Sequence, residues 1–259
     1  MLNKIYTATA LALLLVATSA QGGELTGVDI AKMAEENNSF AMDNASATVK
    51  MEIVTTRGVS RERVIESKMK RDGKGTKKFI RFLEPPDVKG TAFLSLEEKG
   101  KETEQRLYLP AIKTDRRIRS NQKNESFMGT DFTYRDMEGR DIEKATHTRL
   151  PDDKVGGIDC YVVESVPKEP EEEGYSRFVI YVGKETKVPI RIKFYDRKGK
   201  EFKVLTVKKL NKVEGRWVAT ESEMVNLQEN SYTKLYIQKI SFDEKIDDEV
   251  FTRRNLQRG

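Results

Sequence analysis

Apolar and polar residues alternate along most of this chain with a period of two. Residues 47–53, for example, place Ala, Val, Met and Ile at every second position, with Thr, Lys and Glu between them. This period is typical of a strand with one buried and one solvated face. Gly, Asn or Asp residues lie between most of the runs and favour turns there. The pattern predicts ten or eleven strands with little helix between them, over residues 47–53, 61–71, 79–83, 91–96, 105–109, 161–166, 178–182, 190–195, 202–207, 217–227 and 233–242.

One amphipathic helix is predicted over residues 26–43. Thr26 can cap its N-terminus, and Asp29 suits its first turn. Its apolar side consists of Val28, Ile30, Met33 and Ala34. The polar residues 37–39 predict a stop or a bend near that point. Shorter helices are predicted near residues 131–137, 140–146 and 247–256.

A long antiparallel sheet with one apolar face must bury that face. Since only one substantial helix is predicted, we expect a mainly β fold in which a single curved antiparallel sheet forms an incomplete, half-open β-barrel covered by a few helices. A closed barrel or a β-sandwich is the alternative, because alternation alone does not distinguish these folds. No internal repeat and no Ser/Gly-rich linker divides the chain, so residues 21–259 are predicted to form a single domain. Residues 140–151 are polar without a clear period, and residues 167–174 form an acidic loop between prolines and glycine.

Residues 1–20 have the features of a cleavable secretory signal. Lys4 is the only charged residue, residues 8–17 are apolar, and the small residues Thr18-Ser19-Ala20 suit a cleavage site. The apolar run is shorter than the ~20 residues that a transmembrane helix needs, and a buried N-terminal helix is the alternative. We therefore expect an exported, periplasmic protein that is cleaved near Ala20. No Cys lies at positions 17–24, which disfavours a lipid anchor.

The charge of the chain is mildly basic. It carries 47 Lys and Arg against 42 Asp and Glu, a net charge of +5. These charges are interspersed along the predicted strands rather than gathered in one block, and such a distribution mainly confers solubility. No nucleic-acid-binding module is recognisable in the sequence. We expect no nucleic acid among its partners.

Few residues suit catalysis or metal binding. His147 is the only His, which removes multi-His zinc sites and leaves no Ser-His-Asp or Cys-His set, and we interpret it as a surface residue. Cys160 is the only Cys, so it cannot pair within the chain, and it is predicted to pack as a small apolar side chain. The acidic pairs at 152–153 and 247–248 suit capping and solvation. No phosphate-binding glycine motif is present. The sequence predicts a non-enzymatic protein without catalytic residues, metal or cofactor.

Three segments carry a family resemblance: FLEPPDVKGTAFL (residues 82–94), LYLPAIKTDRRI (107–118) and SFMGTDFTYRD (126–136). In order and spacing they resemble segments of the outer-membrane lipoprotein-sorting family related to the periplasmic carrier LolA, and DDEVFTRRNL (247–256) is similar to a LolA-like ending. The resemblance implies a LolA-like half-open barrel with the helix at 26–43 across its mouth. It also implies a carrier or binder of lipids or lipoproteins during transfer toward the outer membrane. Its partners would be acyl chains, an inner-membrane export complex and an outer-membrane acceptor, with only peripheral or transient membrane contact.

If the concave face of such a sheet is only partly filled, it forms an apolar cavity for acyl chains, in which each buried CH₂ contributes ~0.8 kcal/mol. Inward-facing strand residues are the candidates for its lining, and ordinary core packing is the alternative for each of them. The candidate lipid-binding residues are Val49, Met51, Ile53, Ile65, Met69, Ile190, Ile192, Phe194, Leu235 and Ile237.

Two further groups are candidates for contact with partners. Lys113, Arg116, Arg117 and Arg119 follow Pro110 and are predicted to bind a partner protein or lipid headgroups; the alternative is a solvated edge that discourages sheet pairing. Phe127, Met128 and Phe132 surround Gly129 and are predicted to form a lid or a docking loop, with burial as a plug as the competing interpretation. These groups support a second hypothesis, a non-enzymatic accessory interaction module of an envelope export system.

Overall fold

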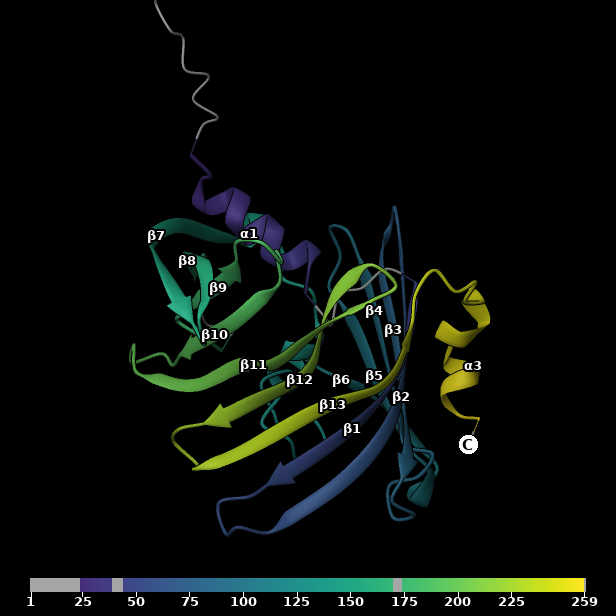
Figure 1. Ribbon diagram of the computed structural model, residues 1–259. Coiled ribbons are helices and arrows are strands. Elements are labelled where there is room, and N and C mark those ends of the chain that lie inside the picture. The colour runs from purple at the N-terminus through teal and green to yellow at the C-terminus, as the bar shows by residue number, and fades with distance from the viewer. Residues whose placement is uncertain (1–23, 39–43, 170–173, 259) are drawn as a thin grey trace, which may run out of the picture.

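The computed structural model describes residues 24–38, 44–169 and 174–258, and an antiparallel sheet dominates this part of the chain (Figure 1). Thirteen strands pair in the order β6-β5-β4-β3-β2-β1-β13-β12-β11-β10-β9-β8-β7 within the described residues. The strands are β1 (Ala45–Val54), β2 (Ser60–Asp72), β3 (Gly75–Glu84), β4 (Ala92–Glu98), β5 (Glu104–Leu109), β6 (Thr114–Ile118), β7 (Ala145–Val155), β8 (Ile158–Pro167), β9 (Arg177–Gly183), β10 (Pro189–Tyr195), β11 (Glu201–Val213), β12 (Arg216–Asn226) and β13 (Ser231–Ser241). Strands that follow one another in the sequence pair with each other, except β6 and β7, which lie at opposite edges of the sheet. Strands β1 and β13 also pair and connect the two halves of the sheet.

The sheet curls without closing. Its two outermost strands, β6 and β7, are not paired with each other, and the inner face encloses the main hydrophobic core. The predicted mainly β, half-open barrel is therefore confirmed, and the closed barrel is excluded for the described residues. All eleven predicted strands are present, whereas β6 and β7 were not predicted. Both are polar edge strands with solvated faces, so neither shows an apolar period of two.

Helix α1 (Gly27–Glu36) lies at one end of the sheet and packs against β7, β8 and β9 (Figure 1). Thr26 and Asp29 form a capping box, as the sequence predicted, and the helix ends at Asn37. The buried side of the helix is Gly27, Ile30, Ala31 and Ala34. Val28 is 41% exposed, so its placement on the apolar side was wrong. The helix is also shorter than predicted, although residues 39–43 lie outside the described part.

The C-terminal segment covers the convex face of the sheet. The 3₁₀ helix η5 (Asp248–Phe251) and helix α3 (Arg253–Leu256) pack against β3 and β4, and Figure 1 shows them outside the barrel. Phe251 and Leu256 join Phe79 and Leu94 in a second core cluster on that face. Strands β3 and β4 therefore bury apolar side chains on both faces.

The other predicted short helices are present as 3₁₀ turns. They are η3 (Arg135–Met137) and η4 (Ile142–Lys144), and two further 3₁₀ turns, η1 (Pro110–Ile112) and η2 (Ser120–Gln122), flank β6. The predicted signal at residues 1–20 lies outside the described residues, and so do four residues of the acidic loop at 167–174. Among the described residues, no helix is long and apolar enough to cross a membrane.

Candidate functional site

The hollow of the curved sheet is entered by one long connection between β6 and β7. We call residues 123–137 the plug segment. Phe127, Phe132, Tyr134 and Met137 of this segment are buried in the main core. The Phe127 ring lies edge-on to Phe93 at 5.2 Å and to Tyr134 at 5.5 Å between centroids. The plug segment therefore fills part of the concave face with its own aromatic side chains.

The burial of these rings decides between the interpretations of the Phe127–Met128–Phe132 group. Phe127 is 2% exposed and Phe132 is 4% exposed, so these two rings are not an exposed docking patch. Met128 is partly buried against the same core. The competing interpretation, a plug, describes the observed positions. A role of the three residues as a lid that moves stays a prediction.

Polar contacts anchor the plug segment to the sheet. The Lys203 ammonium, from β11, donates to the Asp136 carboxylate at 2.8 Å, to the Tyr175 hydroxyl at 2.8 Å and to the Asp131 carbonyl at 3.2 Å. The side chains of Lys203 and Asp136 are only 2% and 5% exposed. Burial raises the pKa of the Asp136 carboxyl, but the Lys203 charge and the hydrogen bonds from Thr133 and Tyr175 outweigh it, so the pKa lies below its ordinary value.

Two further contacts hold the other side of the plug segment. Thr233, on β13, donates from its hydroxyl to the Asp131 carboxylate at 2.6 Å and accepts the Asp131 backbone N–H at 3.0 Å. The guanidinium of Arg63, on β2, donates to the Met128 carbonyl. Strands β2, β11 and β13 thus all bind the same loop across the hollow.

Between the plug segment and the sheet lies an apolar cavity of about 110 Å³. Its wall is formed by β1, β2, β3 and β10–β13, with Phe127, Phe132 and Met137 of the plug segment on the other side. Seven of the ten predicted lipid-binding residues line it: Val49, Met51, Ile65, Met69, Ile192, Leu235 and Ile237. The structure brings these seven together. Binding of lipid by them stays a prediction.

Three predicted lining residues lie elsewhere. Ile190 packs in a separate cluster with Val155 and Cys160, because the pairing register of β9 and β10 shifts between Pro189 and Arg191. Such a bulge reverses the face on which the next side chain lies, so Pro189 lines the cavity and Ile190 does not. Phe194 packs against Tyr175 and Phe178 beside the cavity. Ile53 is buried but lies outside the cavity wall.

A second register shift explains why the lining residue Ile240 was not predicted. The pairing of β1 with β13 shifts register between Thr48 and Val49, so Gln238 has no partner there. Ile237 and Ile240 consequently both line the cavity although they are three positions apart. Ile240 was missed because strict alternation from Ile237 places it on the outer face. Ala47, Leu205 and Val207 also line the cavity, and their alternating runs were the signal that could have found them.

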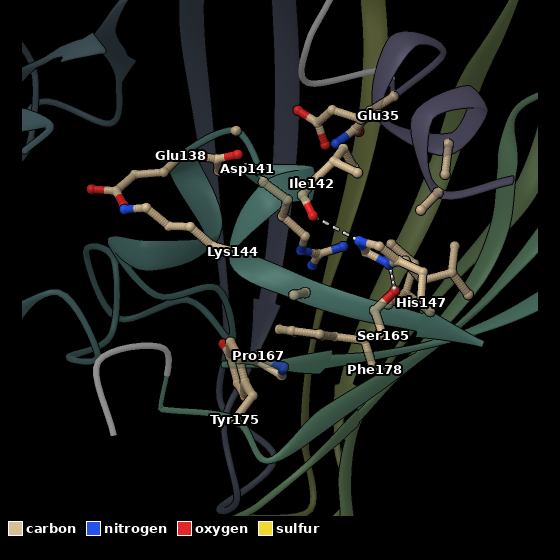
Figure 2. Close-up of a pocket in the computed structure, with 18 of the residues that line it drawn as sticks. Glu35, Glu138, Asp141, Ile142, Lys144, His147, Ser165, Pro167, Tyr175 and Phe178 are labelled. Atoms are coloured by element: carbon tan, nitrogen blue, oxygen red, sulfur yellow. Dashed lines mark hydrogen bonds between the residues drawn. The ribbon is translucent and has the colours of Figure 1, made fainter. Parts of the chain in front are cut away.

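A second, smaller cavity of about 90 Å³ adjoins the first, and we call it the junction cavity. Asn38, Pro189 and Ile192 line both cavities. Figure 2 shows the junction cavity with Glu35 on one side, His147 and Ser165 on another, and Tyr175 and Phe178 below them. Burial raises the pKa of the Glu35 carboxyl, although the Arg140 guanidinium opposes this effect.

The junction cavity opens outward into a polar cleft of about 1830 Å³. The two share Glu35 and most of the loop at residues 138–147, including η4. The cleft itself is lined mainly by charged side chains of α1, the β4–β5 turn and this loop. The charged polar cleft, the junction cavity and the apolar cavity therefore adjoin in that order, from the surface inward.

His147 is the only His of the chain, and it lies in the wall of the junction cavity. His147 Nδ1 lies 2.8 Å from the Ser165 hydroxyl, and its Nε2 lies 3.0 Å from the Ile142 carbonyl (Figure 2). Both ring nitrogens are thus occupied by structural partners, and the ring is half-buried rather than on the open surface as predicted. Among the described residues, no group of three or more His, Cys, Asp or Glu side chains could hold a metal ion. Cys160 is fully buried, as predicted, and burial raises the pKa of its thiol.

The predicted basic group lies along the edge of the sheet. Arg116 and Arg117 are on β6, and Lys113 and Arg119 flank this strand; all four are exposed. Arg117 has a long, exposed ion pair with Glu102 at 3.7 Å, which contributes little to stability. The group is therefore accessible, and its binding to a partner or a headgroup stays a prediction.

Comparison with known proteins gives one family model and several solved structures. The model, described as "-like: Uncharacterized protein", matches residues 74–258. A domain from Vibrio parahaemolyticus, provisionally named an outer membrane lipoprotein-sorting protein domain, has a TM-score of 0.82 and 31% identity over 90% of this chain and 98% of that chain. A DUF1329 family protein from Desulfovibrio piger has a TM-score of 0.81 and 28% identity, covering 89% and 97%.

A LolA superfamily protein from Nitrosomonas europaea has a TM-score of 0.71 over 90% of this chain and 100% of that chain, at 15% identity. At this identity the likeness shows the fold alone. The search of curated proteins finds no match.

Proposed function

This chain belongs to the outer-membrane lipoprotein-sorting protein family and has a LolA-like fold, and from this premise we propose that it is a periplasmic carrier of lipids or lipoproteins. In this proposal the apolar cavity holds acyl chains during transfer toward the outer membrane. The predicted signal at residues 1–20 directs export, and residues 21–259 form the one lipid-binding domain. N-terminal sequencing of the secreted protein tests the first of these points, with a start near Gln21 expected.

The observation that carries the proposal is the apolar cavity behind the plug segment. Its volume of about 110 Å³ is somewhat smaller than the ~150 Å³ of an engineered apolar cavity that binds benzene. It therefore accepts part of an acyl chain in this conformation, and a whole chain needs the plug segment to withdraw. The segment is held by side chains of β2, β3, β5, β11 and β13 rather than by a ladder of backbone hydrogen bonds, so it can be displaced while the sheet stays paired.

The energetics suit a carrier that releases its cargo. A long chain that buries about a dozen CH₂ groups gains ~10 kcal/mol at ~0.8 kcal/mol each. Association and ordering cost ~4–15 kcal/mol, and displacing the plug segment adds to this cost. The remaining affinity is moderate, and binding is reversible.

Lipid retention by the purified protein tests the proposal. We expect protein prepared from the cell envelope to carry acyl-chain lipid that native mass spectrometry detects. Ala47 and Ala219 both line the cavity, so the double variant Ala47→Leu/Ala219→Leu fills it with apolar side chains and should abolish retention. Ala111→Leu makes the same chemical change at an exposed site and should retain lipid. Lipid-free wild-type protein, or equal retention by the filled variant, would refute the proposal.

One observation favours the accessory interaction module as a second candidate. The basic group on and beside β6 is exposed at an open sheet edge, where an acidic partner protein can reach it. Phe127 and Phe132 are buried, so the basic group would bind the partner without the docking loop that the sequence predicted. A photo-crosslinker at Arg117 should capture an envelope protein, and Arg117→Glu should remove the crosslink without changing lipid retention. Absence of a crosslink in intact cells would leave the carrier as the better account.

A further inference from the structure

Arg140 lies where the polar cleft, the junction cavity and the aromatic core meet. Its guanidinium carbon is 4.5 Å from the centroid of the Phe178 ring and 5.4 Å from that of Phe194. The two rings are themselves edge-to-face at 5.6 Å, so they form an aromatic floor beneath the charge. This packing holds the guanidinium in the wall that the polar cleft and the junction cavity share.

Most other charges around the junction cavity already have partners. Asp136 binds Lys203 at 2.8 Å. Glu138 lies 2.8 Å from Lys123 and 3.2 Å from Arg135. These pairs leave neither an acid nor a base free for a ligand.

The remaining charged groups at the junction are Glu35 and Asp141 on the acidic side, and Arg140 and Lys144 on the basic side. Asp141 caps η4 through a 2.9 Å hydrogen bond from the Glu143 N–H. Burial raises the pKa of the Glu35 carboxyl, and the Arg140 charge opposes this effect. Within residues 24–38, 44–169 and 174–258, no carboxylate lies within ion-pair distance of the Arg140 guanidinium or the Lys144 ammonium. Among the described residues the Arg140 guanidinium therefore has no salt-bridge partner, and its N–H donors are open to an anion.

We propose that Arg140 binds the anionic head group, a carboxylate or a phosphate, of an amphiphile with one acyl chain whose tail enters the apolar cavity. The inference rests on the proposed function and names the class of its cargo. The guanidinium offers a fork of N–H donors that matches both anions. Lys144 also lines the junction cavity and adds a second, exposed positive charge.

The narrow connection between the two cavities favours one chain over two, and the whole chain enters when the plug segment withdraws. They measure about 90 and 110 Å³ and adjoin at only three residues, Asn38, Pro189 and Ile192. A head at Arg140 directs its chain past Ile192, which lines both cavities, into the space beside Met51 and Leu235. A second chain would have to displace α1 or the β9–β10 strands, which are packed in the main core.

Displacement of N-phenylnaphthylamine, a neutral apolar dye, tests the proposal on the full mature chain. The competitors are palmitate, hexadecanol and a palmitoyl lysophosphatidate, which share one chain length and differ in the head group. We expect the wild type to bind the better of the two anions at least tenfold more tightly than hexadecanol. Tighter binding of palmitate would identify a carboxylate head group, and tighter binding of lysophosphatidate would identify a phosphate head group.

Variants assign the effect to Arg140. Arg140→Gln should remove the difference between anion and alcohol while changing hexadecanol binding less than twofold. Arg140→Lys should keep part of the difference because it keeps the charge. Arg57→Gln, in the exposed β1–β2 turn, is the matched control and should change nothing.

Equal affinity of the wild type for palmitate, lysophosphatidate and hexadecanol would overturn the proposal and leave the carrier function intact. An equal loss for all three ligands in Arg140→Gln would also overturn it, since it would show only a packing role. If neither the dye nor any ligand bound the wild type, the proposed function would fail together with this inference.

Discussion

Replacing Asp136 with Asn removes the carboxylate that faces the buried Lys203 ammonium. The two side chains are 2.8 Å apart and almost completely buried, so the variant leaves a positive charge without its counter-ion in the core. Removing one partner of a buried ion pair costs ~3–5 kcal/mol. The Tyr175 hydroxyl and the Asp131 carbonyl still accept from Lys203, so we expect the lower end of this range. At ~2–4 °C per kcal/mol, this corresponds to a fall in Tm of roughly 6–12 °C.

Urea unfolding followed by circular dichroism measures the effect. The reference set is Asp136→Asn, Lys203→Met and the double variant. Because each single variant leaves one group buried without its partner, the double variant should be less destabilised than the sum of the two by about 2 kcal/mol. The exposed pair Lys154–Asp159 has a similar distance of 3.0 Å but side chains 68% and 60% exposed, and Asp159→Asn there should cost less than about 0.5 kcal/mol.

Additive losses in the double variant would refute this reasoning, since they would show that the two charges do not depend on each other. A loss for Asp136→Asn no larger than that for Asp159→Asn would refute it as well. Either result would mean that water or a rearranged plug segment replaces the pair without cost.

The other predictions concern acidity, close packing and the thiol. Because folding lowers the pKa of Asp136, its carboxylate stabilises the protein above about pH 5, and this contribution is lost as the pH falls below the ordinary carboxyl pKa. The difference in unfolding free energy between wild type and Asp136→Asn should therefore shrink as the pH is lowered below about 5. Gly27→Ala should cost about 1–3 kcal/mol in urea unfolding, because the new Cβ would lie 2.5 Å from the His147 carbonyl oxygen, whereas Gly73→Ala meets no atom within 4 Å and should be neutral. Cys160 should stay unreactive toward a thiol reagent until the protein is unfolded, and rapid labelling of native protein would contradict its burial.

Much of the fold could be predicted from local patterns in the sequence. Strands β1–β5 and β8–β13 each contain an apolar period of two, and this period depends only on the residues of that strand. The Thr26 capping box is equally local, since its partners are three positions apart. The half-open barrel was predicted because the sheet has an apolar face and the sequence offers only one long helix to cover it.

The cavity was predicted only in part. Seven lining residues follow from alternation within β1, β2, β10 and β13. The exclusion of Ile190 and the inclusion of Ile240 depend on bulges, which arise where two strands pair in a shifted register. No single strand's sequence contains that shift.

The two edge strands and the plug segment were decided by tertiary structure alone. Strands β6 and β7 have no partner on one side, so their residues face solvent and carry no periodic signal. The plug segment is aperiodic, and its rings are buried because the hollow of the sheet is there to receive them. Thus the sequence by itself determined strands β1–β5 and β8–β13 and the direction in which most of their side chains face. Only the tertiary structure decided how much of the hollow is filled and where Arg140 lies, because both depend on contacts between residues far apart in the chain.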